Sequence, residues 1–140
     1  MERPVRVVAE GHHRDRSEAP VGIRAAAQET GAVMSTDRIR ELNDAFRRSF
    51  SGGKVVMTSG VHELPDMVKC AALSEVSRFD RFNEDNDPHG EHDFGSFELC
   101  SRKFFWKIDY YDRELMHGSE DPSDPEKTTR VLTLMLADEC

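Results

Sequence analysis

The chain has 140 residues and a formal net charge of −8, with 33% charged and 37% hydrophobic residues. A chain of this length can bury a core as one domain, and this balance excludes disorder throughout. The excess of negative charge falls in residues 81–140, which hold seven basic and fifteen acidic side chains. That half repels a phosphate backbone, which argues against direct nucleic-acid binding and suits a basic protein partner or a cation.

Residues 1–33 are rich in Arg, Ala, Glu and Gly and show no sustained hydrophobic period. Ser35, Thr36 and Asp37 then offer residue types that are preferred as helix N-caps. We therefore predict a flexible N-terminal extension over residues 1–33, which an upstream start site would explain, and a single α+β domain over residues 34–140. No apolar run approaches the roughly 20 residues of a membrane span, so we expect a cytoplasmic protein without a membrane anchor.

Apolar residues at helical spacing predict two helices. The first runs for about 13 residues after the cap and ends at Ser51-Gly52-Gly53, with Arg47 and Arg48 among the residues on its solvent side. The second begins at Pro65, carries an apolar stripe from Met67 to Phe79 and ends near Arg81. Between the helices, residues 54–59 predict a short strand.

Three further strands are predicted over residues 94–100, 104–111 and 128–137. The middle one shows a two-residue period that turns Trp106 inward. The last one is apolar on both faces, which indicates a strand buried on both sides, with a short helix as the alternative. The predicted fold class is α+β, with two helices packed on a mostly antiparallel sheet of about four strands in the order α-β-α-β-β-β. Cys70 and Cys100 are predicted to be reduced, small core residues.

The run D-N-D-P-H-G-E-H-D over residues 85–93 crowds carboxylates and two imidazoles into a segment that Pro and Gly keep irregular. Imidazole with carboxylate suits a divalent metal such as Zn, Fe or Mn, which could activate water. The predicted metal ligands are Asp85, Asp87, His89, Glu91, His92 and Asp93. An EF-hand is excluded because position 12 of such a loop, where a bidentate Glu is needed, is Ser96.

A structural explanation stays open beside the metal site. Asp and Asn side chains bond their own backbone in turns, Pro fixes φ and Gly permits positive φ, so the run could simply join a helix to a strand. The segment Asp109-Tyr110-Tyr111-Asp112 offers a second pair of carboxylates, which could act as an acid and a base. We favour a strand end that faces solvent, and we predict Asp109, Tyr111 and Asp112 as an interaction surface.

In the segments D-N-D-P-H-G-E-H-D-F-G, F-W-K-I-D-Y-Y-D and R-V-L-T-L-M-L-A-D-E, the chain resembles a family of small alphaproteobacterial proteins with a domain of unknown function. Such proteins are often encoded on plasmids. The resemblance covers roughly Ile39 to Glu139 and leaves out the first 33 residues. It implies a bacterial cytoplasmic protein and supplies no activity or ligand set.

Three functions follow as hypotheses. The first is a binding or regulatory module that acts on a basic protein partner. The second is a divalent-metal-dependent, hydrolase-like enzyme that uses the loop at residues 85–93. The third is an acidic mimic of nucleic acid that occupies a basic site on a DNA-handling protein.

Overall fold

The computed structural model describes residues 29–139, with side chains from Ser35 onward. The elements in chain order are α2 (Glu29–Ser49), β1 (Gly53–Met57), α3 (Ser59–His62), α4 (Asp66–Arg78), β2 (Phe94–Leu99), β3 (Arg102–Tyr111), β4 (Thr129–Leu136) and the 3-10 turn η1 (Ala137–Glu139). This arrangement confirms the predicted α+β class. The predicted flexible extension falls almost wholly on residues outside this described part.

The sheet has the strand order β1-β4-β3-β2. β2 and β4 both pair antiparallel with β3, whereas β1 pairs parallel with β4, so the sheet is mixed but mostly antiparallel as predicted. Cys100 and Ser101 close the β2–β3 hairpin with φ angles of 54° and 65°. Two successive positive φ angles are typical of the tight hairpin turn whose twist matches that of the strands.

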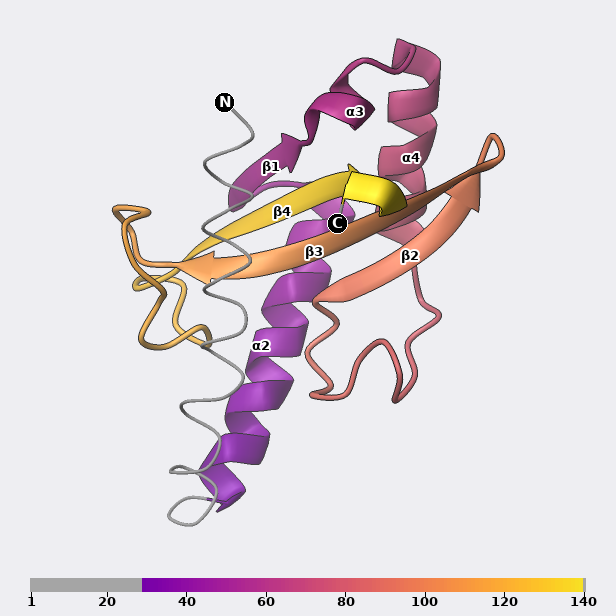
Figure 1. Ribbon diagram of the computed structural model, residues 1–140. Coiled ribbons are helices and arrows are strands. Elements are labelled where there is room, and N and C mark those ends of the chain that lie inside the picture. Colours follow the sequence, from indigo (N-terminus) through magenta and orange to yellow (C-terminus); the bar gives the residue numbers. More distant parts are fainter. Residues whose placement is uncertain (1–28, 140) are drawn as a thin grey trace.

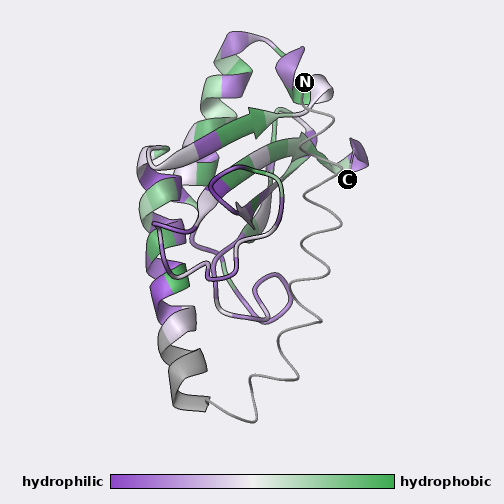
Figure 2. Cartoon of the chain, turned by 90° about the vertical axis from the view of Figure 1, so that its left-hand side faces the viewer, coloured by the Kyte–Doolittle hydropathy of each residue, from purple (hydrophilic) through white to green (hydrophobic). Residues whose placement is uncertain are grey.

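Helices α2 and α4 cover one face of the sheet (Figure 1). The face of β3 that points toward them carries Phe104, Trp106, Ile108 and Tyr110, all fully buried, which confirms the predicted two-residue period. β4 lies between β1 and β3 and is buried from Arg130 to Leu136, as its apolar composition indicated. Hydrophobic residues accordingly concentrate on the strands and hydrophilic ones on the connecting loops (Figure 2).

The helix boundaries differ from the prediction in three places. α2 already begins at Glu29, so Ser35, Thr36 and Asp37 lie inside the helix, because capping residues are only mildly unfavourable there. The short helix α3 was not predicted, and it follows a strand that ends at Met57. α4 ends at Arg78, and Met67 in its first turn is 84% exposed, so the predicted apolar stripe starts later.

The prediction that Cys70 and Cys100 are core residues is wrong. Both are free and exposed, Cys70 on α4 and Cys100 in the β2–β3 turn. The error arises because Cys is often buried, whereas these two positions face outward on their elements. Within residues 29–139, none of the helices is long and apolar enough to cross a membrane.

Candidate functional site

The first acidic loop (residues 81–93) joins α4 to β2, and two asparagines shape its first half. Asn83 Oδ1 accepts hydrogen bonds from the N–H groups of Asp85 at 2.8 Å and Asn86 at 3.1 Å. Asn86 Oδ1 accepts a bond from the Asn83 N–H at 2.9 Å, and its Nδ2 donates to the Arg81 carbonyl at 2.9 Å. The bond to the Asp85 N–H closes an Asx turn, and the others tie the same segment together, so side chains of this half are used to build the loop itself.

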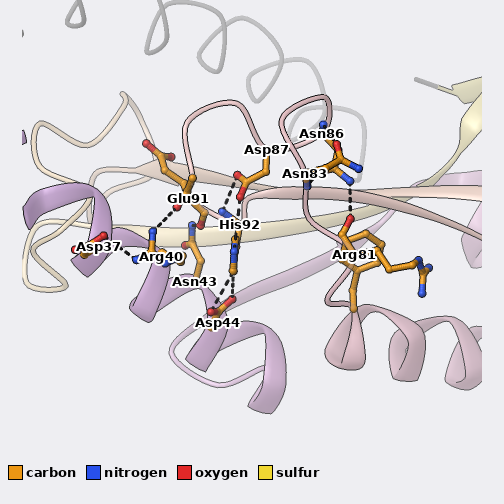
Figure 3. Close-up of polar contacts among 12 residues, drawn as sticks. Asp37, Arg40, Asn43, Asp44, Arg81, Asn83, Asn86, Asp87, Glu91 and His92 are labelled. Carbon is orange, nitrogen blue, oxygen red and sulfur yellow. Dashed lines mark hydrogen bonds and ion pairs between the residues drawn. The ribbon is translucent and has the colours of Figure 1, made fainter. Parts of the chain in front are cut away.

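The second half of the loop lies against α2 (Figure 3). Arg40 Nη1 donates to the Gly90 carbonyl at 2.9 Å, while its Nη2 is held by Asp37 Oδ1 at 2.7 Å. Asn43 Nδ2 donates to the Glu91 carbonyl at 2.9 Å. Because residues three and four apart share one side of a helix, a single polar stripe of α2 holds the loop backbone.

His92 packs inward as the main side-chain contact between loop and helix. Its Nδ1 lies 2.9 Å from Asp44 Oδ1, and its Nε2 lies 3.6 Å from Asp87 Oδ2. Its ring stacks on Phe82 with centroids 3.8 Å apart and planes at 4°, and its backbone takes a positive φ of 57°. The backbone N–H of His92 donates to Asp87 Oδ1 at 3.0 Å, which fixes the bend before β2.

Arg47 connects this contact to α4. It is 1% exposed, and its Nη1 donates to the carbonyls of Val76 at 2.9 Å and Phe79 at 2.8 Å. Its Nη2 donates to Asp44 Oδ1 at 2.8 Å, the oxygen that also faces His92. Arg47 thus satisfies carbonyls at the C-terminal end of α4, so the prediction that it lies on the solvent side of its helix is wrong.

A buried polar cluster lies deeper, where α2, β3 and β4 meet. Asn43 Nδ2 donates to the Tyr110 hydroxyl at 2.7 Å, and that hydroxyl donates to Glu91 Oε1 at 2.8 Å. Asn43 Oδ1 accepts a bond from Arg130 Nε at 2.7 Å, and Arg130 Nη2 donates to the Pro122 carbonyl at 2.6 Å. Burial lowers the pKa of the Arg130 guanidinium, and the nearby Tyr110 and Glu91 oppose that shift.

The six predicted metal ligands do not converge. Asp85 and His89 are exposed, Asp93 is buried, and Asp87, Glu91 and His92 are partly buried in the contacts with α2 and β3. Within the side chains that the structure describes, no three His, Cys, Asp or Glu residues are grouped so that they could hold one metal ion. The geometry therefore gives the metal-site prediction no support.

The predicted surface at the end of β3 does not face solvent as a unit. Asp109 is fully buried and Tyr111 nearly so, with Lys107 Nζ 3.8 Å from Asp109 Oδ2. Burial, together with the neighbouring Asp109, raises the pKa of Tyr111. Asp112 lies partly exposed in the following turn, where the Met116 N–H donates to its carboxylate at 2.9 Å and lowers its pKa. The expectation of a solvent-facing strand end is therefore wrong for Asp109 and Tyr111.

The sequence interpretation missed the contribution of α2 to this site. One signal was present: Asn43 lies four residues after Ile39 and three before Phe46, at positions that point to the core. A polar residue at a core position needs hydrogen-bond partners, and Asn43 finds them in the loop and in β3 and β4. The Asp44–Arg47 pair was also visible as opposite charges three residues apart.

The architecture and site define a class: a small α+β protein with two main helices on one sheet face and a loop anchored to the first of them. Comparison with known protein families identifies the family to which the chain belongs. Residues 57–139 match the model of a family described as protein of unknown function (DUF3768), and the chain belongs to that family. The match confirms the predicted domain-of-unknown-function family and covers β1's last residue through η1. No curated protein and no solved structure matches.

Proposed function

We propose that this protein is a binding module whose first acidic loop presents carboxylates to a basic protein partner. The observation that carries the proposal is that some acidic side chains of the loop bond within the protein, whereas others point to solvent. Asp87, Glu91 and His92 bond to α2, to β3 or to the loop itself, which fixes the backbone. Glu84 and Asp85 are exposed, and their carboxylates bond no other residue in the described part of the chain.

Rigid presentation favours binding because a surface that is already ordered loses little conformational entropy when a partner arrives. The charge balance supports the same proposal, since residues 81–140 carry eight more acidic than basic side chains. Such a field attracts a cationic partner and speeds its association at low ionic strength. A regulatory role through that partner is part of the proposal.

We propose a bacterial cytoplasm as the site of action, with a plasmid-encoded gene. The support for the organism and gene is the resemblance of the three motifs named above. The support for the compartment is the pair of free, exposed thiols of Cys70 and Cys100, which persist best in a reducing environment.

The test is a binding titration with a defined cationic probe, a ten-residue peptide of alternating Lys and Arg, at low salt. The double variant Glu84→Gln/Asp85→Asn should weaken binding by about tenfold, because the two carboxylates are the contacts. The matched control, Glu63→Gln/Glu98→Gln, also removes two exposed acids but lies outside the loop. It should change the dissociation constant less than about twofold.

Equal weakening in both double variants would mean that the probe senses only net charge, and the proposal would fail. It would also fail if elemental analysis of the untagged protein found about one divalent metal ion per chain that was lost in His92→Ala. That second result would restore the metal-dependent alternative.

A further inference from the structure

A continuous path of hydrogen bonds joins the two acidic loops through the interior. The second acidic loop (residues 112–128) connects β3 to β4. The Glu91 carbonyl of the first acidic loop accepts a bond from Asn43, and Asn43 accepts one from Arg130. Arg130 in turn donates to the Pro122 carbonyl of the second acidic loop. Two side chains, both at least 96% buried, therefore separate the backbones of the two loops.

Arg130 depends on both loops at once. Its guanidinium lies over the Tyr110 ring at 5.2 Å, and the Glu91 carboxylate of the first acidic loop is an anion in its surroundings. Its Nη2 uses the second acidic loop as acceptor. A buried guanidinium that loses an acceptor is strongly unfavourable, so Arg130 must shift when the second acidic loop moves away. Asn43, which bonds both Arg130 and the Glu91 carbonyl, links that shift to the first acidic loop.

The second acidic loop can transmit such a movement because its own bonds make it compact. Asp121 Oδ1 accepts bonds from the Ser123 N–H at 3.2 Å and the Ser123 hydroxyl at 2.6 Å, on either side of Pro122. The Thr128 hydroxyl donates to the Asp121 carbonyl at 2.9 Å. Asp121 therefore sets the position of the Pro122 carbonyl on which Arg130 relies.

We propose that the two acidic loops open and close as one conformational unit, coupled through Asn43 and Arg130. The consequence is that an event at either loop changes the population of the open state at the other, with the reciprocity that thermodynamic linkage demands. This coupling is a property of the fold and does not depend on the identity of any partner.

Hydrogen exchange of the full chain at neutral pH tests the coupling. Asp121→Ala loosens the second acidic loop, and the readout is the exchange rate of the Gly90 and His92 amides in the first, which bond to Asp87. We expect these two amides to exchange at least about threefold faster, because local opening sets their rate. The matched control is Asp124→Ala, which removes a carboxylate of the same loop that bonds only the Glu126 N–H.

The control should change the two rates by less than half as much as Asp121→Ala does. The proposal is overturned if Asp121→Ala speeds the exchange of the Gly90 and His92 amides by less than about threefold. It is also overturned if the two variants change these rates equally. The amides of β2, the edge strand that pairs with β3, should keep their rates, which separates coupling from general destabilisation.

The pathway is tested by repeating the comparison in Asn43→Asp, which keeps the acceptor for Arg130 and removes the donor to Glu91. In that background Asp121→Ala should lose at least half of its effect on Gly90 and His92. An undiminished effect would contradict the role of Asn43. The first comparison stands by itself if Asn43→Asp does not fold.

Discussion

At the scale of single residues, a buried guanidinium persists only where acceptors surround it, because the desolvation cost of the charge is large. Arg47 meets this condition with two carbonyls at the end of α4 and the carboxylate of Asp44. Its guanidinium also lies 5.3 Å from the centroid of Phe82 and 5.2 Å from that of Trp106. One side chain therefore joins α2, α4, the first acidic loop and the aromatic core.

Arg47→Met keeps a long apolar side chain but removes every one of these hydrogen bonds. The Phe79 carbonyl then loses the donor that Arg47 supplies, and the Val76 carbonyl keeps only the Phe79 N–H at 3.3 Å. We therefore expect a loss of about 3 kcal/mol in the free energy of unfolding. Urea denaturation followed by circular dichroism measures this loss. Arg48→Met, the same change at an exposed neighbouring position, should cost less than about 0.5 kcal/mol. Similar losses in the two variants would contradict the assigned role of Arg47.

At the scale of elements, the turn after β3 depends on one partly exposed carboxylate, that of Asp112. Asp112 accepts the Met116 N–H at 2.9 Å, and this bond, with those of the His117 and Leu115 backbone, lowers its pKa below the ordinary value of 3.8. A lowered pKa in the folded state means that the ionised carboxylate stabilises the turn above the unfolded value. That stabilisation is lost as the pH falls through the folded value.

We therefore expect the turn at residues 112–116 to loosen on acidification below about pH 4, with the rest of the sheet intact. The measurement is a carbon-13 titration of the Asp112 carboxyl together with the chemical shift of the Met116 amide. Both should titrate together, below the midpoint of an Asp in an unstructured peptide. Asp112→Asn should remove the pH dependence of the Met116 shift, and its persistence in that variant would assign the effect to another group.

The elements that could be predicted from the sequence are those whose burial follows a simple period. The sequence predicts β3 because apolar residues alternate toward one face of the strand, namely Phe104, Trp106, Ile108 and Tyr110. It predicts β4 because the residues on both faces of that strand are apolar. Strand order was not predictable, since the pairing of β1 with β4 joins segments more than 70 residues apart and has no local signal.

The site was less predictable than the fold, for a physical reason. The composition of the first acidic loop identified the segment, but the side chains that anchor it come from α2, about 50 positions earlier. An amphipathic pattern predicts that charged helix residues face solvent. Arg47 is buried instead, because the carbonyls of Val76 and Phe79 at the end of α4 accept its hydrogen bonds. The same pattern could have flagged Asn43 as a polar residue at a core position.

At the scale of the whole molecule, the sheet separates two environments. The face toward α2 and α4 holds the main hydrophobic core, whereas the opposite face carries a small cluster of Val56, Tyr111 and Val131 beside the buried Asp109. A phenol in such surroundings strongly prefers its neutral form, because burial and the adjacent carboxylate both disfavour the phenolate. Global unfolding removes both the burial of the Tyr111 phenol and its proximity to the Asp109 carboxylate.

This preference makes stability depend on pH on the alkaline side. The folded pKa of Tyr111 is raised above that of an unfolded tyrosine, about 10, so the stabilisation is fully present below pH 10 and is lost as the pH rises. At pH 11 the unfolded state gains about 1.4 kcal/mol from ionisation of this one phenol. Tyr111→Phe should abolish that part of the loss, so its melting temperature should fall less than that of the wild type between pH 8 and pH 11. Absorbance of the phenolate, compared between the wild type and Tyr111→Phe through the same titration, should show that Tyr111 ionises only as the protein unfolds. Equal falls in melting temperature, or two tyrosines that both ionise before unfolding, would contradict the assigned environment of Tyr111.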